Sequence, residues 1–278
     1  MSRPELDSDG FQKVKIKRNK RQQPNKYHTK LKQISVEIEK DKDIDVLKSI
    51  ERLRSCVEEL RVSSFSEDVI KSVSSVLQDR KVVEIYCLGL GHVAECHISR
   101  YQLALLLCLN EHFTPEKVLV YDPLFYKSEC EVLKKLQLEV LDENSEGCYA
   151  ISDKGPTLVF FPHCSKQLTN SFLWSNWGPN LHNCILICNS FNNLAESQPS
   201  RFLSDTVPFI ANIRPHTSEQ PLNNNFKFTD CFNDTSIHTF PKANLEKIDS
   251  DFWTKGDQPT YENSEEFITS KALQNLKI

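Results

Sequence analysis

The sequence predicts an α/β protein with a Rossmann-like fold, in which helices cover both faces of a mostly parallel sheet and a helical preface precedes the first strand. From residue 82 to residue 188, short apolar runs alternate with amphipathic stretches, as in a parallel sheet built from crossover units. The runs VLVY, LVFF and ILIC are apolar at every position, which is typical of strands buried on both faces.

The composition is that of a globular protein. Hydrophobic residues make up 39% and charged residues 26% of the 278 residues, which is enough apolar material for a core. No apolar run approaches the length of a transmembrane helix, so we expect no membrane partner. The N-terminus has no apolar signal-like segment, and the ten cysteines include no Cys-x-x-Cys pair. We therefore expect a cytoplasmic protein with reduced thiols.

The charge is uneven, and we predict four segments: a basic disordered tail over 1–32, the helical preface over 33–80, an α/β domain over 81–240 and a polar C-terminal segment over 241–278. The tail has ten basic and three acidic residues, although the whole chain has a net charge of −4. Its cluster KIKRNKR (15–21) fits nuclear import, nucleic-acid contact or a merely solvated tail. Because the remainder is acidic, we expect nucleic acid to bind only through the tail. The nucleus is a second possible location.

Two helices are predicted in the preface. Apolar residues recur at spacings of three and four over 44–62, which indicates an amphipathic helix. Ser66 is a suitable N-cap for a second helix that ends near Leu77.

The domain begins with a strand at 82–88. The other strands expected from apolar runs are 117–121, 138–141, 157–161 and 184–188. The helices expected between them are 103–111, 125–136 and 166–174. The first of these helices would start from a capping box with Ser99 at the N-cap and Gln102 at N3. Beyond residue 200 we expect a strand at 206–213, an antiparallel edge within 226–240, and a frayed polar end.

Ligands of open parallel sheets bind at the carboxyl ends of the strands, where the strand order reverses. With the assumed order 3-2-1-4-5, the first and fourth strands flank this point. His92 and His163 are then expected to face each other across one crevice. The candidate pocket residues at the strand ends are Gly89, Gly91, His92, Asp122, His163, Cys164 and Asn189.

The segment Gly89–Ala94 matches the pattern G-x-G-x-x-G/A, in which glycines let the backbone approach a phosphate. It fits a nucleotide-type ligand, either a dinucleotide or S-adenosylmethionine, or else a tight turn that the fold requires. Two features weaken the match: the next helix is expected to start near Ser99, and Asp122 lies 28 residues beyond Ala94 rather than about 20. Asp122 either binds a ribose or starts a turn.

His163 and Cys164 follow the fourth strand and are candidate ligands for haem iron or another metal, or a base and nucleophile with no third group assigned. Cys96 and His97, in the loop after the glycines, rank second. The cysteines inside apolar runs are expected to be inert buried thiols; they are Cys87, Cys108, Cys184 and Cys188. The tryptophans expected to pack a helix onto the sheet, rather than to form a stacking platform, are Trp174 and Trp177.

Several segments, taken in order, resemble one known family. They are Ile85–Gly91, Ser99–Ala104, Tyr121–Pro123, Phe161–Cys164, Asn176–Trp177, Cys188–Phe191 and Phe232–His238. In this order and spacing they are similar to the sensitivity-to-red-light-reduced (SRR-like) domain family over residues 80–240. The resemblance implies light and clock regulation in plants, and regulation of haem biosynthesis and of circadian clock gene expression in animals. It implies protein partners and no established reaction.

Three functions follow from these observations. The first is a regulatory protein whose strand-end pocket senses a ligand or docks a partner. The second is an enzyme that uses a nucleotide-type cofactor in the same crevice. The third is an interaction module whose basic tail binds the partner. A haem link through a Cys-Pro motif is not supported, because none of the ten cysteines precedes a proline. His163 and Cys164 remain the candidate haem ligands.

Overall fold

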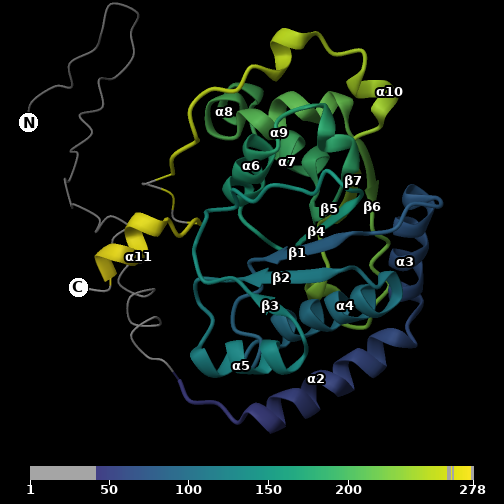
Figure 1. The fold of residues 1–278 in the computed structure, drawn as a ribbon, viewed down its shortest axis with the longest axis vertical. Coiled ribbons are helices and arrows are strands. Elements are labelled where there is room, and N and C mark those ends of the chain that lie inside the picture. The colour runs from purple at the N-terminus through teal and green to yellow at the C-terminus, as the bar shows by residue number, and fades with distance from the viewer. Residues whose placement is uncertain (1–41, 262–263, 265, 277–278) are drawn as a thin grey trace, which may run out of the picture.

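A computed structural model describes residues 42–261, 264 and 266–276, and shows a seven-stranded mixed sheet between two layers of helices (Figure 1). The strands are β1 (Glu84–Leu88), β2 (Lys117–Tyr121), β3 (Glu139–Val140), β4 (Thr157–Phe161), β5 (Cys184–Asn189), β6 (Ser218–Pro221) and β7 (Thr235–Thr239). Their order in the sheet is β3-β2-β1-β4-β5-β7-β6. The predicted fold class and the assumed order of the first five strands are confirmed.

β1 lies in the middle of the parallel part of the sheet. Ile85 pairs with Val118 on β2 and with Leu158 on β4, and all pairs from β3 to β5 are parallel. β7 then pairs antiparallel with β5, and β6 pairs antiparallel with β7. The expected antiparallel edge therefore exists, but only β7 lies within the predicted range 226–240, and β6 lies wholly before it.

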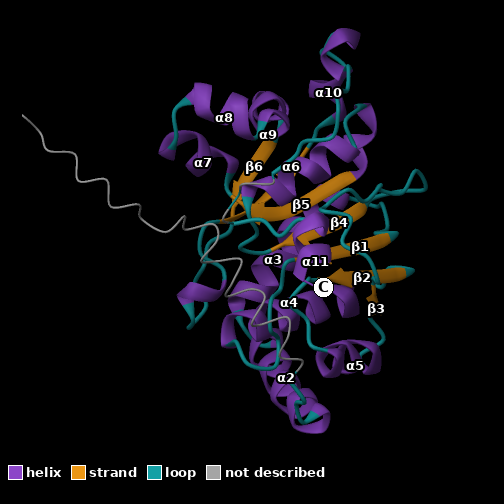
Figure 2. Ribbon diagram, turned by 90° about the vertical axis from the view of Figure 1, so that its left-hand side faces the viewer, coloured by secondary structure: helices purple, strands orange, loops and turns teal. Residues whose placement is uncertain are grey.

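Helices from different parts of the chain cover the two faces of the sheet (Figure 2). The elements of one face are α2 (Val46–Arg61), α3 (Ser64–Leu77), α4 (His97–Phe113), α5 (Lys127–Lys135) and the short η3 (Thr229–Cys231). The elements of the other face are α6 (Lys166–Ser175), η1 (Pro179–Asn183), α7 (Phe191–Ser197), α8 (Ser200–Thr206), α9 (Pro208–Ile213) and α10 (Lys242–Leu245). Side chains alternate between the two cores along β1: Ile85 and Cys87 join the first, Tyr86 and Leu88 the second.

Both preface helices are present, with one correction to their caps. Asp45 caps α2 by accepting a hydrogen bond of 3.0 Å from the backbone N–H of Lys48. Ser63, rather than the predicted Ser66, caps α3. The hydroxyl of Ser63 accepts from the backbone N–H of Ser66, whose own side chain is buried.

The predicted capping box at Ser99 is wrong, because α4 begins at His97 with Cys96 as its N-cap residue. Gln102 does not turn back to the helix start. Its Nε2 donates to the carbonyl of Cys231 at 3.1 Å, which holds the side chain in the core.

The strand predicted at 206–213 is also wrong. α8 ends at Thr206, and α9 runs from Pro208 to Ile213. Proline suits the first turn of a helix because its missing N–H is not needed there. Ile210 and Ile213, spaced by three residues, bury the apolar side of this short helix.

The C-terminal segment is not frayed where the structure describes it. Trp177 stacks on Phe252 with ring centroids 5.1 Å apart, and its indole N–H donates to the carbonyl of Phe252. Trp174 donates to the carbonyl of Gly256. Both tryptophans therefore contact the C-terminal segment, whereas the sequence predicts that they pack a helix onto the sheet. Further elements of this segment are η4 (Ser250–Trp253) and α11 (Ser270–Leu276).

The connection between α9 and β6 contains one more short helix, η2 (Arg214–His216). No helix within the described part of the chain combines the length and apolar character needed to cross a membrane. The basic cluster at 15–21 lies outside the described residues.

Candidate functional site

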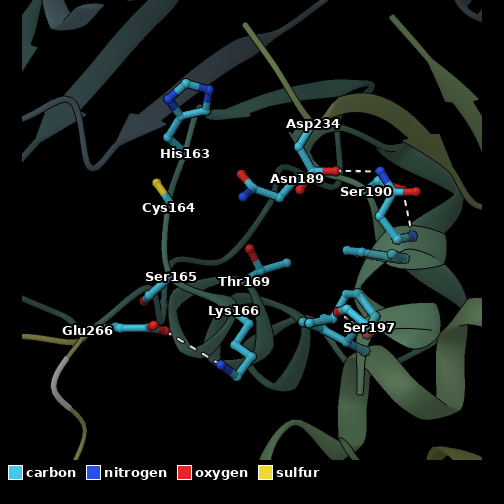
Figure 3. A pocket seen from close by; sticks show the side chains of 14 residues that line it. His163, Cys164, Ser165, Lys166, Thr169, Asn189, Ser190, Ser197, Asp234 and Glu266 are labelled. Carbon is cyan, nitrogen blue, oxygen red and sulfur yellow. Dashed lines mark hydrogen bonds and ion pairs between the residues drawn. The ribbon is translucent and has the colours of Figure 1, made fainter. Parts of the chain in front are cut away.

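Two pockets lie at the carboxyl edge of the sheet, one on each side of the loop between β4 and α6. The larger, which we call the β4–β5 pocket, has a volume of about 570 Å³. Its polar lining includes His163, Lys166, Thr169, Asn189, Ser190 and Asp234 (Figure 3). Three of these residues stand at strand ends or in the loops that follow them, as expected for this fold.

The smaller pocket, which we call the β1–β4 pocket, has a volume of about 190 Å³. Gly89 and Asp122 line it from the ends of β1 and β2, and Cys164 lines it from the loop after β4. Phe267 of the C-terminal segment closes part of it. Gly91 and His92 line neither pocket, so the two pockets contain five of the seven predicted residues.

The two glycines after β1 are required by the backbone. Gly89 has φ of +75° and Gly91 has φ of +68°, in the region that side chains with a Cβ rarely adopt. Gly89 also has no room for a side chain, because a Cβ there would lie 2.4 Å from the Sγ of Cys164.

Asp122 stabilises the glycine turn through two hydrogen bonds to the backbone. Its Oδ2 accepts a hydrogen bond of 2.7 Å from the N–H of Gly91, and its Oδ1 accepts one of 2.8 Å from the N–H of Leu124. The carboxyl is buried, and this burial raises its pKa. These two hydrogen bonds to the backbone support the turn alternative for Asp122.

Glu129 on α5 is a buried acid that the sequence reasoning missed. Its Oε1 accepts from the N–H of Ala94 at 2.8 Å, and its Oε2 accepts from the N–H of Tyr126 at 3.0 Å. The same Oε2 lies 3.0 Å from Nδ1 of His92. One signal was available: Glu129 precedes Val132 and Leu133 by three and four residues, which places it on the buried side of the helix.

Glu129 also favours the protonated form of His92. The hydrogen bond to Glu129 raises the pKa of His92, and the His92 ring stacks on Tyr126 with centroids 4.0 Å apart. His92 therefore belongs to the glycine loop and α5. The expectation that it faces His163 across one crevice is not met, because the two rings have different partners and share neither pocket.

Two backbone donors of the glycine loop are already engaged and are not free to bind a phosphate. A phosphate at such a loop is bound by free backbone N–H groups. Here the N–H groups of Gly91 and Ala94 donate to the buried acids Asp122 and Glu129. These two N–H groups are therefore not available to an anion, and any negative charge on the two carboxyl groups would repel it. The pattern G-x-G-x-x-A is thus fulfilled by a turn.

His163 occupies the loop between the two pockets in a left-handed backbone conformation, with φ of +53°. Its Nε2 lies 3.2 Å from the carbonyl of Asn233, and its Nδ1 lies 3.2 Å from Nε2 of Gln102. The only assignment that satisfies both contacts has the proton on Nε2, which donates, while Nδ1 accepts. Both ring nitrogens are therefore engaged.

Cys164 is held as a thiol. Its Sγ lies 3.1 Å from the carbonyl of Leu88, to which it donates. Burial raises the pKa of this thiol well above its usual value. A thiol that stays protonated is a weak nucleophile. Haem iron would have to displace the hydrogen bond of Cys164 to Leu88 and the contacts of both ring nitrogens of His163, so the observed arrangement does not favour axial ligation of haem.

Asn189, the last residue of β5, has a side-chain oxygen without a hydrogen-bond partner among the described residues. This atom, Oδ1, is buried. Its side chain lies in the β4–β5 pocket, between Cys164 and Asp234 in Figure 3. A buried acceptor without a partner costs about 1–3 kcal/mol, so a donor that enters this pocket would recover that cost.

The second-rank candidates Cys96 and His97 lie elsewhere, at the beginning of α4. Neither lines either of the two pockets. The ring of His97 instead approaches Asp230 in η3, with Nε2 and Oδ2 3.0 Å apart.

Comparisons with known proteins agree with the resemblance found in the sequence. The SRR1 domain model matches residues 69–239. An SRR1-like protein of Drosophila melanogaster is 32% identical over 242 residues, which cover 85% of each chain. An SRR1-like protein of Mus musculus is 32% identical over 199 residues, covering 59% of this chain and 80% of the mouse protein.

A plant protein is also similar. The protein SENSITIVITY TO RED LIGHT REDUCED 1 of Arabidopsis thaliana is 26% identical over 180 residues, covering 63% of this chain and 65% of the plant protein. The family match extends over more than half of the chain and includes β1 to β7. This chain therefore belongs to the SRR1 domain family.

Proposed function

We propose that this protein is a regulatory member of the SRR1 family that binds a small polar ligand in the β4–β5 pocket. The observation that carries the proposal is the buried, unpartnered Oδ1 of Asn189 at the carboxyl end of β5. Buried polar atoms in folded proteins nearly always have partners. A ligand with an N–H or O–H donor would supply the missing one.

The surrounding side chains favour a ligand that carries both donors and acceptors. Lys166 and Thr169 line the pocket from α6, and Ser190 and Asp234 line it from the β5 side. Lys166 faces the carboxylate of Glu266 at 3.5 Å, so the pocket contains charges of both signs. This mixture favours a polar, hydrogen-bonding molecule over a multiply charged anion.

The chemistry of the edge supports binding rather than catalysis. Cys164 is a protonated thiol, His163 has both ring nitrogens engaged, and both oxygens of Asp122 accept backbone hydrogen bonds. An acid–base pair needs groups that can reach a substrate and change protonation near neutral pH. No observation at the glycine loop favours the alternative of a nucleotide-dependent enzyme.

The biological setting is proposed from the relatives. The name of the plant protein refers to sensitivity to red light. We extend this to a proposed role of this chain in light- or rhythm-dependent regulation. The processes regulated would be clock-gene expression and haem biosynthesis. Regulatory protein partners, an action in cytoplasm and nucleus, and nucleic-acid contact through the basic tail belong to the same proposal.

The test is thermal unfolding of the purified full chain with defined probes: adenosine, AMP, NAD, S-adenosylmethionine and haem. A ligand at 100 times its Kd stabilises a protein by about 2.7 kcal/mol, which raises Tm measurably. We expect at least one polar probe to raise Tm of the wild type and to lose this effect in Asn189→Leu. Asn183→Leu, just before the opposite end of β5, is the matched control. The proposal fails if no probe raises Tm, or if Asn189→Leu responds like the wild type.

A further inference from the structure

Three side chains that commonly bind metals converge outside both pockets. They are His97 at the beginning of α4, and Asp230 and Cys231 in η3. Their ligand atoms all lie within 4.8 Å of one another. The Nε2 of His97 is 3.0 Å from Oδ2 of Asp230, and the Sγ of Cys231 is 3.9 Å from Oδ1 of Asp230. The two segments that supply these groups are far apart in the sequence.

We propose that His97, Asp230 and Cys231 form a zinc site. Zinc binds nitrogen and oxygen at about 2.0–2.2 Å and sulfur at about 2.3 Å in a tetrahedron, so its ligand atoms lie roughly 3.3–3.8 Å apart. The separations of 3.0 and 3.9 Å in this cluster bracket that range. Small movements of exposed side chains would complete the geometry around an ion.

The donor set favours zinc among the divalent ions. One imidazole, one carboxylate and one thiol suit a borderline-soft ion, whereas magnesium and calcium prefer oxygen ligands. Cys231 is not engaged in a disulfide, and neither is any other of the ten cysteines. Three protein ligands leave the fourth position of the tetrahedron to water or to another ligand.

The three ligand side chains differ in how far they are exposed to solvent. The side chains of His97 and Asp230 are about half exposed, whereas Cys231 is fully buried. An ion would therefore enter from the solvent and rest on the sulfur, with the imidazole and the carboxylate closing over it. The usual penalty for a buried thiolate would be offset by the charge of the metal.

The protein already holds the two ligand segments in place. The carbonyl of Cys231 accepts a hydrogen bond from Gln102, one and a half turns further along α4 than His97. Phe232, the next residue, stacks on Phe65 of α3 with ring centroids 4.6 Å apart. Such support reduces the loss of conformational freedom on metal binding.

Zinc at this site would also act on the β4–β5 pocket. Gln102 contacts both the carbonyl of Cys231 and the ring of His163, and the carbonyl of Asn233 accepts from that ring. Fixing η3 against α4 would thus fix the partners of a pocket residue. This consequence is separate from the ligand proposal, because zinc binding can be measured without any pocket ligand.

The test uses the full chain, reduced and stripped of metal by a chelator, then titrated with Zn²⁺ or with Co²⁺ as a spectroscopic probe. We expect one ion per chain, an increase in Tm, and visible cobalt bands of a tetrahedral site with a thiolate charge-transfer band. His97→Asn and Asp230→Asn should weaken binding by at least about tenfold, because each removes one of three protein ligands. Cys231→Ser should abolish the charge-transfer band.

His112→Asn, in the last turn of the same helix, is the matched control and should bind like the wild type. Because Cys231 is buried, Cys231→Ser could fail to fold, and the exposed His97 and Asp230 then decide the question. Binding that does not change in His97→Asn and Asp230→Asn would place the metal elsewhere and overturn the proposal. Absence of zinc binding by the folded wild type would overturn it as well.

Discussion

Gly89 and Cys164 meet at the carboxyl edge of the sheet, where a Cβ on Gly89 would lie 2.4 Å from the Sγ of Cys164. The thiol takes the space that a side chain at the end of β1 would need, and it donates to the carbonyl of Leu88 beside that glycine. The predicted site residues Gly89 and Cys164 therefore form one packed contact, and each constrains the identity of the other.

This contact should make Gly89→Ala strongly destabilising. The positive φ and the clash together should lower the free energy of unfolding by about 2–4 kcal/mol. Gly91→Ala is the matched control: it has a similar φ, but its Cβ would be 3.4 Å from the hydroxyl of Ser99, so only the backbone cost of about 1 kcal/mol remains. Urea unfolding measures the free energy of unfolding of both variants. The double variant Gly89→Ala/Cys164→Ala should regain part of the stability lost in Gly89→Ala. Equal effects of the two single variants would contradict the packing argument.

The backbone conformation of Gly91 also predicts the effect of a larger change in the loop. With φ of +68° at this position, a β-branched side chain is strained. We therefore expect Gly91→Val to lower the free energy of unfolding, which the same urea titration measures. Stability equal to that of the wild type would contradict this expectation.

The contact between His92 and Glu129 should make stability depend on pH near neutrality. The hydrogen bond to Glu129 raises the pKa of His92 in the folded protein. Its stabilising contribution is complete below the unfolded pKa of about 6.5 and is lost as pH rises through the raised value. The free energy of unfolding should therefore fall above about pH 6.5 in the wild type. In His92→Gln this part of the pH dependence should disappear, and an unchanged slope would rule the contact out as its source.

Glu129→Gln tests how much the buried carboxylate of Glu129 contributes to stability. The amide that replaces the carboxylate cannot accept from both Ala94 and Tyr126 while facing His92. We expect a loss of about 2–3 kcal/mol, since a buried donor is left unpaired. Urea unfolding at fixed pH is the measurement. Glu131→Gln on the exposed side of the same helix is the control, with an effect within about 0.5 kcal/mol.

Glu219 on β6 predicts acid sensitivity of the antiparallel edge. Burial acts to raise its pKa, but hydrogen bonds from His238 and Ser190 prevail and lower the pKa to about 2. A carboxyl group whose pKa is lower in the folded state stabilises the fold when the pH is above its pKa in the unfolded state. This contribution is lost as the pH falls toward 2. Unfolding free energies at about pH 5.5, 4 and 3 should therefore decline in the wild type and decline less in Glu219→Gln. Parallel curves for the two proteins would contradict this assignment.

Haem gives the sharpest test of the predicted ligands. Because His163 and Cys164 are committed to other partners, we expect no saturable Soret shift that depends on them. The measurement is an absorbance titration of the reduced protein, compared with His163→Ala/Cys164→Ala. A saturable shift that is lost in the double variant would make these residues haem ligands after all.

The sequence predicted the parallel half of the sheet because its signals are local. Continuous apolar runs mark β1, β2, β4 and β5, and turn residues follow them at the carboxyl edge. The order of these strands was assumed from the doubly wound fold and could not be read from the sequence. α9 was missed because Ile210 and Ile213 sit in a segment too short for helical periodicity to be read.

The site was only partly predictable for a different reason. The sequence shows which residues end the strands, but it does not show that Glu129, from the next helix, accepts hydrogen bonds from the glycine loop. Asn189 was predicted, but the sequence does not show that its side-chain oxygen is buried without a partner among the described residues. The C-terminal contacts of Trp177 likewise depend on tertiary structure, since the segment around Phe252 is polar in sequence.

The pairing of β5 with β7 has a consequence for synthesis of the chain. β5 ends at Asn189, and its partner strand begins only at Thr235. On the ribosome, the strand Cys184–Asn189 emerges first and exposes the open edge of a nearly all-apolar strand until the later segment arrives. Such edges are templates for aggregation. The nascent protein should therefore pass through an interval in which this edge of β5 is open to aggregation, and the interval ends when β7 pairs with it.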